Sequence, residues 1–175
     1  MKSSTSDVFT TIKPVSTKIS RYISYYYFHN SENEDYQKRF IFYPNYKHGL
    51  TAYKNSKVVL SKNKASVTST DSNHIEPLYS INKDKAIKVS IEGRFDKIGV
   101  VFNPLGINHF IEKPLHDIFS NDVNFLPYFG ETFEKTLKEV FSKSNVEEKV
   151  FLLDEFFKKA YNDFHQPILK KAVGN

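Results

Sequence analysis

The sequence of 175 residues contains no cysteine, no tryptophan and only six glycines. Without cysteine the chain has no disulfide framework, no thiolate metal site and no cysteine nucleophile. The few glycines form no phosphate-binding loop, and no window approaches the roughly 18 apolar residues that span a bilayer. The stretch from Met1 to Lys18 is polar and lacks the apolar segment of a secretory signal. We therefore expect a soluble, cytoplasmic protein without a membrane partner.

A strong excess of one charge is also absent. The chain has 25 Lys and Arg against 20 Asp and Glu, a net charge of +5 that is spread along its length. The densest basic stretch, Lys54 to Lys64, interleaves lysine with Ser, Asn and Val, which is typical of a solvated hairpin. A nucleic-acid footprint would cluster its basic residues on one face. The chain itself is therefore not expected to bind DNA.

Aromatic residues, in contrast, are abundant, with 16 Phe and 11 Tyr among 39% hydrophobic residues. From residue 20 onward, short alternating or aromatic-rich runs are separated by polar turn clusters, a pattern that predicts β-strands. The predicted strands are Arg21–Phe28, Lys38–Tyr43, His48–Tyr53, Lys57–Leu60, Ala65–Ser69, Ile75–Ile81, Ala86–Ile91 and Lys97–Phe102. They predict a small antiparallel barrel or sandwich over residues 20–103, after a flexible lead-in over residues 1–19.

Two of these runs predict which faces are buried. Ile87, Val89 and Ile91 alternate with polar residues, so one face of that strand should lie in a core and the other in water. The run from Ile98 to Phe102 is almost continuously apolar. That strand should be covered on both faces, and helices should pack on it.

After Pro104 the apolar spacing becomes helical. Short helices are predicted over Leu105–Ile111 and Leu115–Phe119, each preceded by a proline. A longer amphipathic helix is predicted over Glu131–Lys143. Ser144 to Glu147 forms a capping-box pattern that predicts the start of another helix. Residues 104–165 should therefore form a helical subdomain.

The last of these helices carries Val150, Leu153 and Phe157 on one stripe. Such a stripe serves two purposes, packing on the β-region or pairing with its copy in a homodimer, and packing on the β-region is the expectation. Residues 166–175 begin another helix with Pro167 near its first position. We expect that helix to be the start of a linker that continues the chain.

Patterns of catalysis and metal binding are missing. The six histidines lack both the two-residue spacing of a strand site and the His-x-x-x-His spacing of a helix site. There is no Gly-x-Ser-x-Gly elbow. The acidic groups at Glu32 to Asp35 and at Asp154 and Glu155 are expected to be solvated. We therefore expect no metal, no cofactor and no catalytic residue, and so no enzyme.

The aromatic strands instead predict a small-molecule pocket, because apolar walls supply affinity and a few polar groups supply orientation. A fully packed interior would exclude this prediction. The candidate ligand-binding residues are Phe40, Phe42, Tyr43, His48, Tyr53 and Phe102.

A family resemblance rests on the C-terminal half. The run Ile98 to Gly106 reads Ile-Gly-Val-Val-Phe-Asn-Pro-Leu-Gly, and Pro114-Leu115-His116 and an amphipathic helix pair follow it. This ordered set resembles the N-terminal domain of bacterial AraC-type transcription regulators, over roughly residues 20–173. The resemblance implies an α+β fold: a small cupin-like antiparallel β-barrel or sandwich followed by a C-terminal helical hairpin.

The resemblance also implies a function. The chain would sense an effector, dimerise, or do both, and DNA would be bound only by helices that follow this chain. The effector is an unknown small molecule. The alternatives are a stand-alone cupin-like enzyme that uses a metal, a metabolite-binding protein, and a pure dimerisation module.

Overall fold

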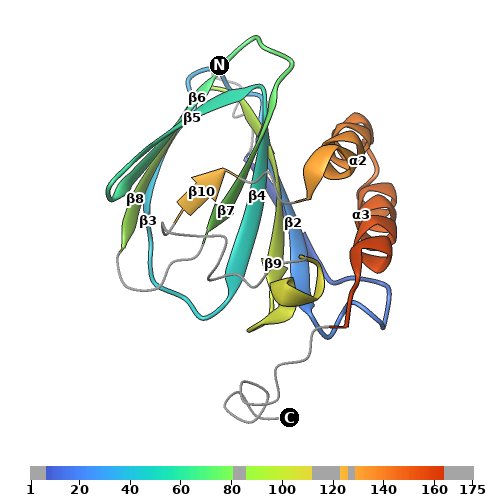
Figure 1. The fold of residues 1–175 in the computed structure, drawn as a ribbon. Coiled ribbons are helices and arrows are strands. Elements are labelled where there is room, and N and C mark those ends of the chain that lie inside the picture. Colours follow the sequence, from blue (N-terminus) through green and yellow to red (C-terminus); the bar gives the residue numbers. More distant parts are fainter. Residues whose placement is uncertain (1–6, 81–85, 112–122, 126–128, 164–175) are drawn as a thin grey trace.

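The computed structural model describes residues 7–80, 86–111, 123–125 and 129–163. These residues form three layers: a four-stranded sheet, a six-stranded sheet and a pair of helices (Figure 1). The two sheets face each other, and the helices cover the outer face of the six-stranded sheet. The six-stranded sheet is therefore the middle layer.

The six-stranded sheet has the order β1-β2-β9-β4-β7-β10, and all of its neighbours are antiparallel. Its strands are β1 (Val8–Ile12), β2 (Ile23–Ser31), β9 (Phe95–Phe102), β4 (His48–Lys54), β7 (Ile75–Ser80) and β10 (Val123–Phe125). The four-stranded sheet has the order β3-β8-β6-β5, and β6 pairs with β8 in parallel. Its strands are β3 (Gln37–Phe42), β8 (Ile87–Glu92), β6 (Lys64–Ser69) and β5 (Ser56–Ser61).

All eight predicted strands are present, and the α+β class is confirmed. The described strands form two facing sheets and do not close into a barrel. The barrel alternative is therefore wrong, and the sandwich alternative describes the two sheets. The alternation predicted for residues 86–92 is also present, since Ile87 and Ile91 are buried while Lys88 and Glu92 are exposed.

Residues 1–19 were predicted to be a flexible lead-in, and for residues 7–19 this prediction is wrong. Val8–Ile12 is strand β1, which pairs with β2 from Val8 opposite Asn30 to Ile12 opposite Tyr26. Ile19 is fully buried. The strand reads VFTTI, with β-branched and aromatic residues that do not alternate with polar ones, and the polar, Ser/Thr-rich residues around it concealed it. Because β1 lies at the edge of the sheet, Phe9 is 58% exposed. Residues 1–6 lie outside the described part of the chain.

The helices differ from the prediction in detail. The structure has a 3-10 turn η1 (Gly106–His109) and two α-helices, α2 (Gly130–Ser142) and α3 (Val146–Ala160). Residues 105–111 were predicted as a longer helix. The predicted helix over residues 115–119 and the linker helix over 166–175 lie outside the described residues.

The cap of α3 is one residue later than the capping box predicted. The Asn145 side-chain oxygen accepts hydrogen bonds from the backbone N–H groups of Glu147 (2.7 Å) and Glu148 (3.3 Å). Ser144 is therefore not the N-cap residue. Asn145 fills the role because its amide oxygen reaches two of the amides that the first turn leaves unpaired.

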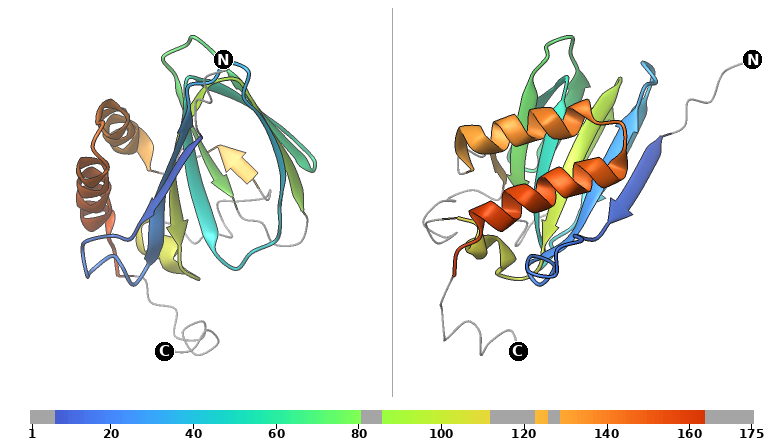
Figure 2. Two further views of the ribbon diagram at one scale, coloured as in Figure 1. Left: turned by 180° about the vertical axis from the view of Figure 1, so that it is seen from behind. Right: turned by 90° about the vertical axis from the view of Figure 1, so that its right-hand side faces the viewer.

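The predicted stripe on α3 packs on the sheet of its own chain. Val150, Leu153 and Phe157 are at most 1% exposed and belong to one core with residues of β2, β4 and β9. The Phe157 ring meets the Phe102 ring edge-on at 5.8 Å. Figure 2 shows α2 and α3 lying side by side across the outer face of this sheet.

Strand β9 is covered on both faces, as its apolar run predicted. Ile98, Val100 and Phe102 face the helices and are at most 1% exposed. Lys97 and Val101 face the space between the two sheets. The strand is therefore the shared wall of the helical core and of the sandwich interior.

The glycines of the run from Ile98 to Gly106 allow close approaches. A Cβ at Gly99 would lie 1.8 Å from Cε1 of Tyr27, so the tyrosine ring lies directly on the strand backbone. A Cβ at Gly106 would lie 2.1 Å from the carbonyl oxygen of Tyr22. That carbonyl also accepts a hydrogen bond from the Asn103 N–H at 2.8 Å. The run thus seats the turn after β9 against the start of β2.

Asp154 on α3 is buried, not solvated as predicted. Its carboxylate accepts hydrogen bonds from the N–H groups of Val15 (2.9 Å) and Ser16 (2.7 Å) and from the Tyr26 hydroxyl (2.8 Å). The side chain is 4% exposed. This single carboxylate joins α3 to strand β2 and to the segment that leads into it.

We expect Asp154→Asn to lower the free energy of unfolding by about 2 kcal/mol, because hydrogen bonds to a charged acceptor are each worth roughly 1.5–3 kcal/mol. Urea denaturation followed by circular dichroism measures this loss. Glu155→Gln is the matched control on the same helix and should change stability by less than about 0.5 kcal/mol. Equal effects of the two substitutions would contradict the role given to Asp154.

Candidate ligand-binding site between the sheets

A cavity of about 240 Å³ lies between the two sheets. Strands of both sheets line it, so its walls are formed by the inward-facing side chains of the sandwich. The lining residues are Tyr25, Tyr27, Phe40, Phe42, Asn45, Lys47, His48, Gly49, Thr51, Tyr53, Val58, Leu60, Ala65, Val67, Leu78, Ile87, Val89, Lys97 and Val101. Most of these side chains are apolar or aromatic. The sandwich interior is therefore not fully packed.

One wall of the cavity is built on β9. The Tyr27 ring lies over Gly99, and its hydroxyl is 2.6 Å from the Thr51 hydroxyl. Tyr27, Gly99 and Thr51 are cross-strand neighbours on β2, β9 and β4. Because glycine has no side chain, the ring spans the middle strand and reaches the hydroxyl beyond it. The wall is thus an aromatic plane with one polar edge.

At one end, the space between the sheets is filled by a small hydrophobic core. Tyr53, Val58, Val67 and Leu78 line the cavity and are at most 7% exposed. They pack in one cluster with Ile91 and Phe95. Asn45 and Lys47, between β3 and β4, line the cavity and are more exposed. The cavity therefore has an apolar closed end and a polar rim.

Gly49 provides part of the empty space. It lies on β4 and lines the cavity, and a Cβ built on it would have no heavy atom within 4 Å. Leu50 and Ala52, its neighbours along the strand, belong to the helical core. Because strand side chains alternate, a side chain at position 49 would project into the cavity.

Lys97 is a cation among aromatic rings at the buried end. The residue is 8% exposed. Its ammonium lies 5.8–5.9 Å from the ring centres of Tyr27, Phe40, Tyr53 and Phe95. These distances are at the outer edge of cation–π attraction. Within the described part of the chain, Lys97 forms no ion pair with a carboxylate.

The surroundings of Lys97 disfavour its charge. Burial lowers the pKa of the Lys97 ammonium to about 8, the nearby Lys38 ammonium adds to this effect, and the Asp7 carboxylate opposes it. His29 lies opposite Lys97 on β2. Burial and the Lys97 charge lower the pKa of His29 as well. The cavity thus holds a cation whose charge the protein only partly compensates.

Asp7 joins the two sheets beside this cation. Its carboxylate accepts hydrogen bonds from the Tyr36 hydroxyl (2.8 Å) and the Lys38 ammonium (3.1 Å) and contacts the His29 ring. His29 lies on the six-stranded sheet and Lys38 on the four-stranded sheet. Burial acts to raise the pKa of Asp7, but these three partners together lower it. Asp7 is therefore an ionised clamp between the layers.

The predicted ligand-binding residues do not all meet. Phe40, Phe42, His48 and Tyr53 line the cavity. Tyr43 follows the end of β3 and is 66% exposed. Phe102 is fully buried on the opposite face of β9, against the helices. These two residues lie outside the cavity. Tyr43 does so because the strand has ended, and Phe102 because its side chain is on the same face of β9 as that of Ile98, towards the helices.

Lys97 and Thr51 line the cavity but are not among the residues that the sequence indicated, whereas Tyr27 belongs to the aromatic residues of the first predicted strand that suggested a pocket. A signal for Lys97 was present, since its side chain lies on the same face of the strand as that of Val101, directly before a continuous apolar run. A charged residue at an inward-facing strand position is seldom buried without a purpose. Thr51 carries no comparable signal.

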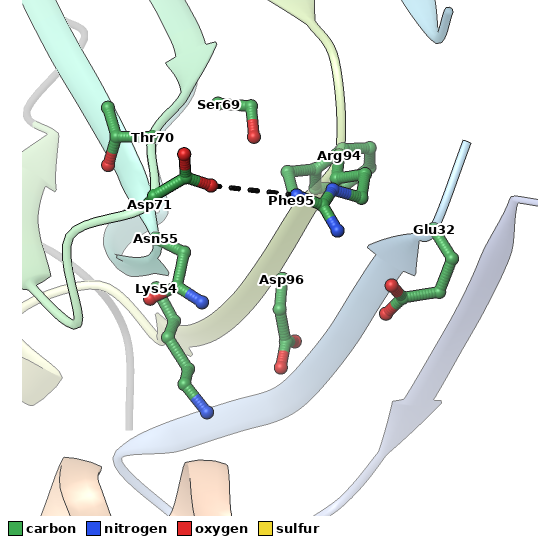
Figure 3. Close-up of a pocket in the computed structure, with 9 residues that line it drawn as sticks. All are labelled: Glu32, Lys54, Asn55, Ser69, Thr70, Asp71, Arg94, Phe95 and Asp96. Atoms are coloured by element: carbon green, nitrogen blue, oxygen red, sulfur yellow. Dashed lines mark ion pairs between the residues drawn. The ribbon is translucent and has the colours of Figure 1, made fainter. Parts of the chain in front are cut away.

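A second hollow is polar. It measures about 190 Å³ and is lined by residues of several loops and strand ends, among them Glu32, Lys54 and Asp96. Figure 3 shows the Arg94 guanidinium directed at the Asp71 carboxylate, at 3.7 Å. Asp71 is fully exposed, so this ion pair is weak. Burial raises the pKa of Asp96. Acidic and basic side chains, some exposed and some half-buried, are mixed in this hollow, so its charges do not indicate one class of ligand.

Among the described residues, no three or more His, Asp or Glu side chains gather where a metal could be held. In the same part of the chain, no helix has the length and apolar character needed to cross a membrane.

Comparison with known proteins gave no relative. The chain matched no protein-family model, no curated protein and no solved structure.

The buried Lys97 predicts a rise of stability with pH. Its pKa of about 8 in the folded chain lies below the ordinary value of 10.5, so between these values the unfolded chain binds more protons. The free energy of unfolding should therefore increase from pH 8 towards pH 10. Above that, the buried tyrosines act in the opposite sense, because their pKa values are raised from the ordinary value of 10.0.

Lys97→Met should remove this rise and increase the free energy of unfolding at pH 7 by up to about 3 kcal/mol, the equivalent of the pKa shift. Urea denaturation at several pH values checks both effects. Lys88→Met removes the same charge from the exposed side of β8 and should leave the rise in place. A wild-type stability that stays flat from pH 8 to pH 10 would contradict the burial of the charged Lys97.

Proposed function

We propose that this chain is the effector-sensing domain of an AraC-type transcription regulator and that the effector binds between the two sheets. The observation that carries the proposal is the inter-sheet cavity of about 240 Å³. Its apolar walls and few polar groups are the composition of a small-molecule site. An engineered cavity of about 150 Å³ holds benzene, so this one is large enough for a small organic effector.

The arrangement of the layers supports a sensing role. Strands β2, β4 and β9 line the cavity with one face and contact α2 and α3 with the other. A ligand that shifts these strands therefore acts directly on the helices. Such a shift changes the regulator only if the ligand binds two arrangements of the protein with different affinity. The same proposal includes a cupin-like sandwich and a homodimer of this chain.

The regulator part of the proposal rests on the resemblance of residues 98–106 and the helix pair to AraC-type sensor domains. In the structure, the turn of this run packs on the start of β2, and the helices pack on β9. DNA would be recognised by helix-turn-helix motifs that follow this chain.

Gly49→Val should fill the cavity. The new side chain enters space where no heavy atom lies within 4 Å of its Cβ, and valine favours strands more than glycine does. We expect a higher melting temperature without ligand and loss of the stabilisation that an effector from a metabolite library gives to the wild type. Differential scanning fluorimetry measures both.

The control for this substitution is Thr68→Val, which adds a β-branched apolar residue at an exposed position of β6. It should leave effector stabilisation unchanged. An effector that stabilises Gly49→Val as strongly as the wild type binds elsewhere. The inter-sheet cavity would then not be the effector site.

The regulator assignment predicts the sequence downstream of Asn175. The reading frame should continue into two helix-turn-helix motifs, whose recognition helices read the major groove. Sequencing the coding region past this codon checks the prediction. A stop codon directly after Asn175 would refute the regulator while leaving a metabolite-binding protein in its place.

A further inference from the structure

We infer that the cavity binds a small monocarboxylic acid with an aromatic or short aliphatic body, whose carboxylate pairs with the ammonium of Lys97. This inference rests on the proposed function, because it assumes that a small molecule occupies the cavity. The geometry that carries it is a buried ammonium that faces an apolar cavity and forms no ion pair with a carboxylate of the described residues.

The acidic groups near Lys97 are occupied or directed elsewhere. The Asp7 carboxylate is shared among Tyr36, Lys38 and His29. The neighbouring Asp96 lies on the other face of β9, and the positive charges that act on its carboxylate are those of Lys149 and Lys54. Asp7 therefore compensates the Lys97 charge only from a distance. Within the described residues no carboxylate forms an ion pair with Lys97, and a bound carboxylate would supply one.

The rings around Lys97 do not replace a counter-ion. Four ring centres lie at 5.8–5.9 Å, close to the limit of about 6 Å for cation–π attraction. An ammonium without a close partner in an apolar site is costly to bury. An anion that enters the cavity would give this ammonium the close partner that it lacks.

The size and charge of the cavity restrict the anion. A volume of about 240 Å³ exceeds the roughly 150 Å³ that holds benzene, so one ring or a short chain fits together with a carboxylate. A single ammonium neutralises one negative charge. A phosphate ester carries close to two charges at neutral pH, which would leave one of them buried and unpaired.

A second lysine at the cavity is already engaged. The Lys47 ammonium donates a hydrogen bond to the Ser24 hydroxyl at 2.9 Å and lies 5.8 Å from the centre of the Tyr25 ring. It lies between β3 and β4, at the polar rim. A carboxylate held there would leave the buried Lys97 without a partner. The ring or chain of the ligand should therefore point towards Lys47, and its carboxylate towards Lys97.

The test is calorimetric titration with two acids, phenylacetate and octanoate, and with their neutral amides, phenylacetamide and octanamide. We expect at least one acid to bind the wild type roughly 10- to 100-fold more tightly than its amide, since a charge-assisted hydrogen bond is worth about 1.5–3 kcal/mol. Lys97→Met should remove this preference and weaken acid binding by a similar factor. Lys97→Gln serves as a second variant with a polar side chain.

Lys88→Met is the matched control, since it removes one positive charge from the outer surface. Lys47→Met tests the other lysine of the cavity and should weaken acid and amide alike, so both variants should keep the preference for the acid. Equal binding of acid and amide by the wild type, or loss of the preference in Lys47→Met alone, would overturn the role of Lys97 but leave the cavity as a binding site. If neither acids nor amides bind, the inference fails. If, in addition, no library compound distinguishes the wild type from Gly49→Val, the proposed function fails as well.

Discussion

The double burial of strand β9 is the constraint on which this structure depends. Side chains alternate along a strand, so Ile98, Val100 and Phe102 fall into the helical core while Lys97 and Val101 face the other sheet. A shift of one residue in its pairing with β2 and β4 would exchange these sets. The ammonium would then enter the helical core, and Phe102 would fill the cavity. The register of one strand therefore defines both the hydrophobic core and the candidate site.

Glycine at two inward-facing positions keeps the interior open. Gly99 lets the Tyr27 ring lie flat across β9, and Gly49 leaves space beside it. The open interior is stabilised from outside, by the helical core on one side and by the Asp7 clamp at the edge of the two sheets. A sandwich with a dry, filled interior would need neither the glycines nor a buried lysine. These features together are more consistent with a binding protein than with a structural module.

The sequence predicted the strands because their aromatic and β-branched runs are separated by polar turns, and it predicted the buried stripe on α3 because Val150, Leu153 and Phe157 repeat at helical spacing. It did not predict β1, because this exposed edge strand is short, its residues VFTTI do not alternate between apolar and polar, and polar residues surround it. It did not predict the burial of Asp154, because the donors that stabilise this carboxylate come from residues far away in the chain. In the site, aromatic composition identified Phe40, Phe42, His48 and Tyr53 as candidates. A continuous apolar run does not show which face each residue takes, and for this reason Phe102 was assigned to the wrong side.

The two tyrosines at the centre of β2 connect the cavity to the helices. Tyr27 forms a wall of the cavity with its hydroxyl at Thr51, while Tyr26 points to the other face and donates to Asp154 on α3. Burial and the Asp154 carboxylate both raise the pKa of Tyr26, so this donor keeps its proton at physiological pH. A ligand that displaces the Tyr27 ring together with the backbone of β2 would also move Tyr26, and that movement would strain its buried hydrogen bond to the helix. Because packed cores respond to such strain by changing between discrete arrangements, adjacent residues on one strand provide a short physical route from the proposed effector to the helical layer.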